Sequence, residues 1–245
     1  MHRFFVQPEN ISGDEVIISG PDVSHIRTVL RLQEGSRVHI LDGLGNRYIV
    51  QLTSVQPREV RGQIESREDF QTESPLAIQM GMALLKGNKF DPVLRKAVEL
   101  GVCRISPLKT DRCIIRVPRT EAEKKTARWQ RIAREAARQS GRSSLPEVSP
   151  NIQTVEDFCR ESREAEIKLV FWEEEEVRKL SDVSPTNIPR SIAFLTGPEG
   201  GFSSEEIETA RQYGFQSITL GPRILRAETV PIVVLSLLQS RWGDL

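Results

Sequence analysis

The stretch Leu195-Thr196-Gly197-Pro198-Glu199-Gly200-Gly201-Phe202-Ser203 joins an apolar run, residues 192–195, to an amphipathic one, residues 204–213. The first run favours a strand and the second a helix, with Ser203 or Ser204 as its N-cap and Glu206 placed for a capping box. Three glycines after a strand allow positive φ and close approach of the backbone to a ligand. Open α/β sheets bind ligands at the carboxyl ends of their strands, so we expect a binding loop here, although a tight turn uses similar residues.

A second stretch of the same kind follows, Leu220-Gly221-Pro222-Arg223-Ile224-Leu225-Arg226-Ala227-Glu228-Thr229. It leaves an expected strand over residues 218–220 and enters an expected helix over residues 229–239. That helix is apolar on most sides, so we expect it to be buried, partly against another subunit. Charged residues at the mouth of a buried helix are more often functional than those on an exposed one.

Outward from these loops, strands alternate with helices from residue 76 onward, which favours a mainly parallel α/β sheet. Further strands are expected at residues 76–84, 102–108 and 167–172, and helices at 90–100 and 124–142.

The segment before residue 74 has a different pattern. Short strands at 15–18, 37–41 and 47–52, with a short helix at 24–32 capped by Asp22 or Ser24, indicate a small β-barrel. The polar stretch 65–74 then separates two predicted domains, 1–73 and 74–245.

The net charge of zero conceals a segregation of charge along the chain. Residues 86–142 carry 16 basic and 6 acidic side chains, while residues 143–245 carry 10 basic and 17 acidic ones. The basic block includes an amphipathic helix whose apolar stripe contains Trp129 and whose arginines fall on the other faces. It is a candidate footprint for a polyanion, unless the acidic third of the chain neutralises it in the fold.

Several classes of protein are excluded or disfavoured. The chain has no P-loop, no G-x-G-x-x-G after a strand and no G-x-S-x-G elbow. Its three cysteines form neither a disulfide framework nor a zinc site, and its three histidines lack metal-ligand spacing, so no metal is expected. No apolar run is long enough to span a membrane, and the N-terminus lacks a secretory signal, which together predict a cytoplasmic protein.

The two loop sequences, LTGPEGGFSSEEI and LGPRILRAET, resemble those of the ribosomal RNA small subunit methyltransferase E family of the SPOUT superfamily. The opening HRFFV, the HIRTVLRL after Ser24, AVELGV at 97–102 and EAARQSGRSSLPEV at 135–148 resemble the family in the same order. Val230-Pro231 departs from the small residues usual there, but proline is tolerated in a first helical turn.

The resemblance implies an N-terminal PUA-like β-barrel and a C-terminal α/β domain with a trefoil knot over about residues 167–240. It also implies a homodimer that binds S-adenosylmethionine and methylates N3 of a uridine, position 1498 in standard rRNA numbering, in 16S rRNA of the small ribosomal subunit. The cofactor would be held by residues of the two loops: Leu195, Thr196, Gly197, Gly200, Gly201, Leu220, Gly221, Ile224, Leu225 and Arg226.

Because N3 of uridine carries a proton, the reaction needs a base or a cation that stabilises the uridine anion. We expect Arg226 to supply the cation, and Glu228 or Glu199 to act as the base or to orient a loop. The expected RNA contacts are basic and polar residues of both domains: Arg3, His25, Arg27, Arg31, Lys86, Lys89, Arg128, Arg131, Arg138, Gln139 and Arg142. Such phosphate contacts position a substrate without specifying its base.

Three other readings stay open at this point. The alternatives are a SPOUT enzyme that methylates a ribose or a guanosine, a non-catalytic ribosome-assembly factor of the same fold, and a small-molecule α/β enzyme. The methylated product discriminates the first. Arg226 and the two intact loops argue against an assembly factor. A small-molecule enzyme would leave the basic helix and the barrel unexplained.

Overall fold

The computed structural model describes residues 1–68 and 72–245. Its chain forms two compact units, one of Met1–Glu73 with Ala137–Leu145 and the other of Ser74–Ala136 with Pro146–Leu245. Residues 69–71 of the expected polar connection lie outside the described residues.

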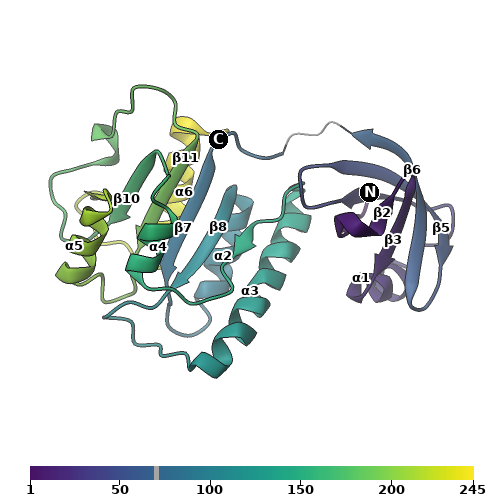
Figure 1. Cartoon of the computed structure of the whole chain (residues 1–245), viewed down its shortest axis with the longest axis horizontal. Coiled ribbons are helices and arrows are strands. Elements are labelled where there is room, and N and C mark those ends of the chain that lie inside the picture. Colours follow the sequence, from purple (N-terminus) through teal and green to yellow (C-terminus); the bar gives the residue numbers. More distant parts are fainter. Residues whose placement is uncertain (69–71) are drawn as a thin grey trace. The chain divides into compact units, whose positions relative to one another are not determined.

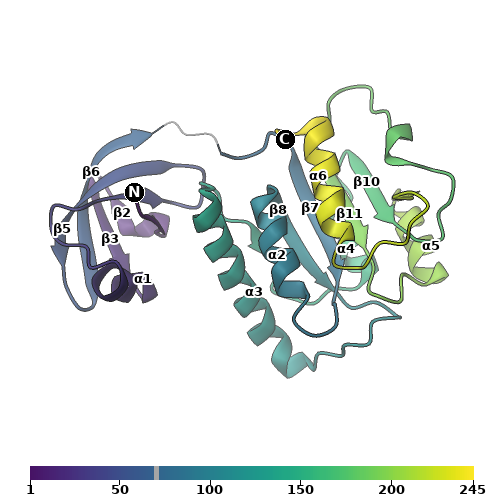
Figure 2. The same ribbon diagram turned by 180° about the vertical axis from the view of Figure 1, so that it is seen from behind.

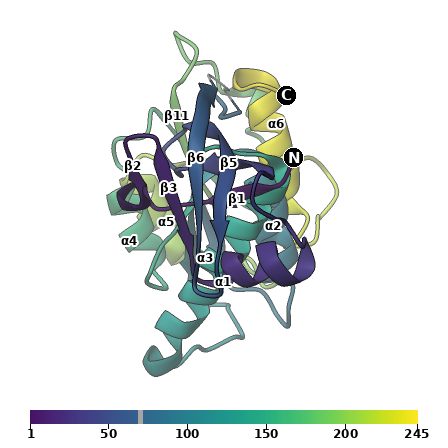
Figure 3. The ribbon, with the colours of Figure 1, turned by 90° about the vertical axis from the view of Figure 1, so that its right-hand side faces the viewer.

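The first unit is a six-stranded sheet with the order β1-β4-β5-β6-β3-β2. β1 pairs with β4 in parallel, and the other pairs are antiparallel. The strands β3, β5 and β6 run alongside one another in Figure 3. The strands are β1 (Arg3–Phe5), β2 (Ile11–Ser12), β3 (Glu15–Ser19), β4 (Arg37–Leu41), β5 (Arg47–Val55) and β6 (Glu59–Glu68).

The helical segment of this unit differs from the expected one over residues 24–32. It begins as α1 (Pro21–Ser24) and continues as one π-helical turn, His25–Val29. Proline suits a first helical position because its fixed φ is helical and its missing N–H would be unpaired there in any case. Gly20 is the N-cap of α1, so Asp22 is not a cap. Ser24 occupies the N-cap position of the π-helical turn, but its side chain makes no cap hydrogen bond. Arg31, with a φ of 52°, follows this turn. A 3₁₀ turn, Pro8–Asn10, precedes β2.

The second unit contains the parallel sheet that the alternating pattern predicts. Its order is β12-β10-β11-β7-β8-β9, and every neighbouring pair is parallel. The strands are β7 (Ala77–Ala83), β8 (Val102–Leu108), β9 (Glu147–Val148), β10 (Ile167–Phe171), β11 (Ser191–Thr196) and β12 (Gln216–Ile218). The carboxyl ends of β10, β11 and β12 therefore meet at one edge of the sheet.

Helices cover both faces of this sheet. α2 and α6 lie on one face and α4 and α5 on the other, as Figures 1 and 2 show from opposite sides. The helices are α2 (Phe90–Glu99), α3 (Arg119–Ser140), α4 (Val155–Glu161), α5 (Ser204–Gln212) and α6 (Val230–Trp242), with a 3₁₀ turn at Leu180–Asp182. This layering confirms the α/β class.

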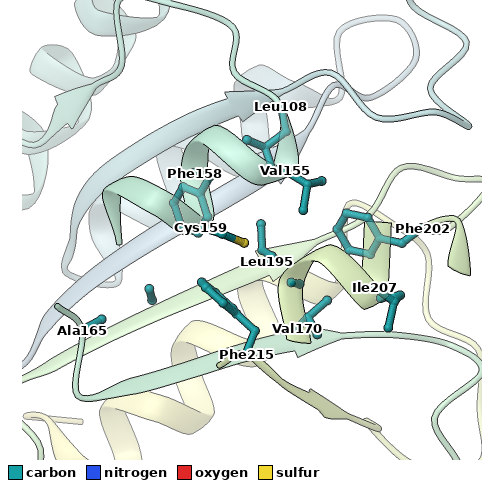
Figure 4. Close-up of a cluster of buried hydrophobic side chains, with 12 residues drawn as sticks. Leu108, Val155, Phe158, Cys159, Ala165, Val170, Leu195, Phe202, Ile207 and Phe215 are labelled. Atoms are coloured by element: carbon teal, nitrogen blue, oxygen red, sulfur yellow. The ribbon is translucent and has the colours of Figure 1, made fainter. Parts of the chain in front are cut away.

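The core beneath α4 and α5 includes one residue of the first glycine-bearing loop. Phe202 is 1% exposed and belongs to the cluster that also contains Phe158, Leu195 and Phe215. Figure 4 shows these side chains together, with Phe202 beside Ile207 of α5. A fully buried aromatic ring contributes a large apolar area, so it anchors the loop that carries it.

Some element boundaries differ from those expected. β12 ends at Ile218, so Leu220 lies in the loop and not in a strand, and α6 extends to Trp242. α3 begins at Arg119, before the apolar stripe that predicts it. The elements that the sequence did not predict are β1, β2, β6, β9 and α4. Across the described chain, no helix is long and apolar enough to cross a membrane.

Candidate functional site

A pocket of about 550 Å³ lies at the carboxyl ends of β10, β11 and β12. This volume is within the range of small-molecule sites. Its position is the one that open α/β sheets use for ligands. The lining residues come from the ends of these strands, from both glycine-bearing loops and from the segment before α2: Lys89, Phe171, Trp172, Glu173, Gly197, Pro198, Glu199, Gly200, Gly201, Ile218, Thr219, Leu220, Gly221, Arg223, Ile224, Leu225, Arg226, Ala227, Glu228 and Val230.

The first wall of the pocket is the loop of residues 197–203, and it needs glycine at position 201. Gly201 has a φ of 71°, in the region that side chains disfavour. A Cβ atom built there would lie 1.5 Å from Oε1 of Glu173. The carboxylate of Glu173 therefore packs directly on this glycine, at the edge of the pocket.

The expected capping box holds the end of this wall. The Ser203 hydroxyl accepts from the Glu206 backbone N–H, and the Glu206 carboxylate accepts from Ser203 N. Burial raises the pKa of Glu206, and hydrogen bonds from the backbone of Ser203 and Asp111 partly offset that effect.

A neighbouring segment, residues 109–113, braces the same loop from outside the pocket. Ser203 Oγ donates to Asp111 Oδ2 at 2.7 Å, and Asp111 N donates to Glu206 Oε1 at 2.9 Å. Arg112 Nη1 donates to the Gly200 carbonyl at 3.2 Å. The wall is thus held by side chains far from it in sequence.

The second wall, residues 220–229, is much more exposed. Gly221 has a φ of 100°, and its N–H donates to Thr219 Oγ1 at 3.2 Å. Ile224 lines the pocket yet is 88% exposed. Thr229 N donates to the Arg226 carbonyl at 2.8 Å, which shapes the turn into α6.

Six charged side chains line the pocket: Lys89, Glu173, Glu199, Arg223, Arg226 and Glu228. Lys89 Nζ lies 3.1 Å from Glu228 Oε1 and 3.9 Å from Glu199 Oε1, and Arg226 lines the same cavity. A hydrogen bond from the Glu228 backbone N–H and one from the Lys89 ammonium lower the pKa of the Glu228 carboxyl. Glu228 is therefore a weaker base than an ordinary glutamate, and it is ionised at neutral pH.

The lining suits the cofactor that the sequence implies. Phe171, Trp172 and Leu225 offer apolar surface to a purine ring, while the Glu173 carboxylate offers an acceptor for hydroxyl or ammonium hydrogens. Gly201 leaves the space that a Cβ would fill. A nucleoside that carries a positive charge, as S-adenosylmethionine does, matches this combination.

Most of the expected cofactor residues lie around the pocket, and two do not. Gly197, Gly200, Gly201, Leu220, Gly221, Ile224, Leu225 and Arg226 line it, as do the expected catalytic residues Arg226, Glu228 and Glu199. Leu195 and Thr196 are fully buried at the end of β11, and neither lines the cavity. Leu195 packs in the core cluster and so supports the wall from behind.

The expected RNA contacts separate into paired and exposed side chains. Arg128 forms two hydrogen bonds with Asp91, and Arg138 Nη1 lies 3.3 Å from Asp22. Arg142 is buried and donates to Glu73. Lys89 is engaged at the pocket. Arg128 is exposed although it is paired, and the other exposed members of the set are Arg27, Arg31, Lys86, Arg131 and Gln139, whereas Arg3 and His25 are half-buried.

The residues of the site that sequence reasoning missed include Phe171, Trp172, Glu173, Asp111 and Arg112. Trp172 ends an expected strand and Glu173 follows it, so the rule that ligands bind at the carboxyl ends of strands applies to them as it does to the two loops. Glu173 begins a run of four glutamates, and such a run is typical of a solvated loop, so its charge alone does not indicate a ligand site. Asp111 and Arg112 carry no signal, because their partners are distant in sequence.

Known proteins match this chain along nearly its whole length. The family model of the RNA methyltransferase domain matches residues 72–239, and that of the RNA methyltransferase PUA domain matches residues 18–65. The ribosomal RNA small subunit methyltransferase E of Synechocystis is 34% identical, covering 96% of this chain and 76% of its own. The protein of the same name from Buchnera aphidicola subsp. Schizaphis graminum is 30% identical, covering 99% and 96%.

Solved structures agree with these relatives. The ribosomal RNA small subunit methyltransferase E of Neisseria gonorrhoeae, bound to S-adenosylmethionine, has a TM-score of 0.89 at 35% identity and covers 100% of this chain and 99% of its own. A methyltransferase of Legionella pneumophila with the same bound cofactor has a TM-score of 0.88 at 33% identity, covering 99% and 98%. This chain therefore belongs to the ribosomal RNA small subunit methyltransferase E family.

Proposed function

We propose that this protein methylates N3 of a uridine, position 1498 in standard rRNA numbering, in 16S rRNA of the small ribosomal subunit. Its cofactor is S-adenosylmethionine, which supplies a methyl group on a positively charged sulfur. The observation that carries the proposal is the convergence of both loops with Arg226 on one pocket, in a chain of this family.

The residues of the pocket have distinct roles in this proposal. The glycine-bearing loops and the apolar side chains Phe171, Trp172 and Leu225 hold and orient the cofactor. The Arg226 guanidinium stabilises the negative charge that develops on the uracil oxygens when N3 loses its proton. Since Arg226 is exposed at the pocket, the uracil base of the substrate can reach it without rearrangement of the core.

The lowered pKa of Glu228 makes this carboxylate a poor proton acceptor. Glu228 therefore orients the second wall in our proposal, with Glu199 doing the same for the first. The N3 proton is then lost to solvent at the open side of the pocket, and Arg226 stabilises the uridine anion that remains.

We propose that RNA phosphates meet the exposed basic side chains, among them Lys86 and Arg131, and those of the first unit, Arg27 and Arg31. Binding by such contacts weakens steeply as salt rises. Replacing Arg131 by alanine is expected to reduce the slope of log affinity against log salt by about one unit.

The architecture of the family completes the proposal. The domains are 1–73, with the PUA-like barrel, and 74–245, with the methyltransferase fold and a trefoil knot over about residues 167–240. The sheet order supports the knot, because the chain leaves β11, passes β10 and adds β12 to the outer edge of β10 before α6 returns to pack on α2. We propose a homodimer formed through α6, where Leu237 is 43% exposed. As an enzyme of ribosomal subunits, it would act in the cytoplasm.

The experiment that tests the function is methyl transfer to defined subunits. The protein is incubated with S-adenosylmethionine and unmethylated small subunits, and the digested RNA is examined by mass spectrometry. N3-methyluridine at the proposed position is the expected product. Another methylated nucleoside would assign a different branch of the superfamily, and tight cofactor binding without any product would favour an assembly factor.

A further inference from the structure

Lys89 occupies the junction of three segments of the second unit. It precedes α2, and its Nζ contacts Glu228 of the second wall at 3.1 Å and Glu199 of the first wall at 3.9 Å. The backbone N–H of Lys86, in the same short segment, donates to Glu199 Oε1 at 3.0 Å. One segment thus holds a carboxylate from each wall of the pocket.

The charges of this cluster favour a role inside the site. Both carboxylates lie within reach of the same ammonium, so they are close to each other and would repel one another without it. Lys89 faces two carboxylates and shares the pocket with Arg226, and these four side chains carry no net charge, so the charge of this lysine is already neutralised within the pocket. Its neighbour Lys86 is exposed and offers its ammonium to solvent.

We propose that Lys89 is a positioning residue of the methyl-transfer site, which holds the two walls of the cofactor pocket together through Glu228 and Glu199, and is not a contact to RNA phosphate. This inference rests on the proposed function, since it assumes that the pocket binds S-adenosylmethionine for methyl transfer. The lysine acts through the carboxylates and does not need to touch the reacting atoms.

Calorimetric titration of the full-length protein with S-adenosylmethionine provides the first test. The side chains of Lys89 and Glu228 are 41% and 25% exposed, so their interaction has the modest strength of a surface pair. K89M is expected to raise Kd by about two- to fivefold, and K89R to restore most of the affinity. In a cycle with E228Q, the effect of K89M is expected to shrink, because its partner is already neutral.

The salt dependence of subunit binding separates the two possible roles of this lysine. K86M, the matched control three residues away, is expected to reduce the salt slope by about one unit and to leave the cofactor Kd unchanged. K89M is expected to leave the salt slope as in the wild type and to lower kcat more than it raises KM for the subunit.

Two results would overturn the inference. One is a K89M protein that keeps the wild-type cofactor Kd and loses as much salt slope as K86M. The other is a K89M effect of equal size with and without E228Q. If K89M does not fold, K89R and the E228Q and E199Q proteins still report the coupling through their affinities. Cofactor binding tests Lys89 even if no uridine is methylated, so a failure of the proposed function is recognised separately.

Discussion

The two walls of the pocket are built from similar residues but are held in different ways. Residues 197–203 are anchored by buried Phe202, by the capping box of α5 and by Asp111 and Arg112. Residues 220–229 make local hydrogen bonds, and the pair of Glu228 with Lys89 joins them to a distant segment of the chain.

This difference assigns different tasks to the walls. The braced wall is a preformed surface, which lowers the entropy that a ligand must overcome on binding. The exposed wall carries Arg226 and Ile224, the groups that an incoming base would meet. Substitutions in the first wall should therefore act on cofactor binding and stability, and that of Arg226 in the second wall chiefly on the chemistry.

The largest effect is expected for R226A. Removing a cation that stabilises a developing negative charge typically lowers kcat by about 10²- to 10³-fold. Because other groups hold the cofactor, its Kd should change by only a few-fold. Methyl transfer to small subunits and calorimetry measure the two quantities. If R226A lowered cofactor affinity as much as it lowers kcat, the two walls would not differ in their tasks.

The next effect contrasts G201A with G221A. Both glycines have positive φ, so each alanine should cost about 1–2 kcal/mol of stability. The new methyl at position 201 also displaces Glu173, whereas nothing lies within 4 Å of the one at position 221. We expect G201A alone to weaken cofactor binding by about tenfold, or 1.4 kcal/mol. Equal affinities of the two variants would argue against a precise fit at the first wall.

A smaller effect is expected for S203A. It removes the side-chain cap of α5 and the bond to Asp111, so unfolding by urea should show a loss of about 1 kcal/mol. The methylation rate at saturating cofactor should stay near that of the wild type. S204A, one residue inside the helix, is the matched control and should be close to neutral.

The smallest effect is a difference in pH dependence between E206Q and E228Q. The raised pKa of Glu206 means that the folded state favours the protonated carboxyl. Its contribution to stability is therefore lost as pH rises through the folded-state pKa. The lowered pKa of Glu228 contributes to stability above the unfolded-state pKa, and this contribution is lost as pH falls through the folded-state pKa.

Relative to the wild type, E206Q should therefore gain stability and E228Q should lose it as pH rises across the glutamate range, about pH 3 to 6. Thermal unfolding of both variants at several pH values measures the two slopes. Slopes of the same sign would show that the two walls do not differ electrostatically.

Local patterns predicted much of the fold. Alternating strands and helices indicated the parallel sheet, and Ser203 with Glu206 indicated the capping box, because both depend on residues close in sequence. α3 was shorter in the prediction, since its first turns are polar and carry no apolar period. β9 has two residues, too few for any pattern.

Long-range partners limited the prediction of the site. The sequence predicts phosphate contacts for Arg128, Arg138 and Arg142 of the basic block, and it does not show that they pair with Asp91, Asp22 and Glu73, which are distant in the chain. The pairing of Lys89 with Glu228 has the same origin. A sequence shows that a charge is present, and only the fold shows what neutralises it.

The place of β7 in the sheet has a consequence for synthesis of the protein. β7 lies between β8 and β11, and its pairing with β11 joins Ala77–Ala83 to Ser191–Thr196. At about 5–20 residues per second, translation leaves this apolar edge without its partner for roughly 5–20 s. An unpaired edge of this kind recruits other strands. Slow codons between the two segments should therefore lower the yield of folded protein, and a nascent-chain chaperone should restore it.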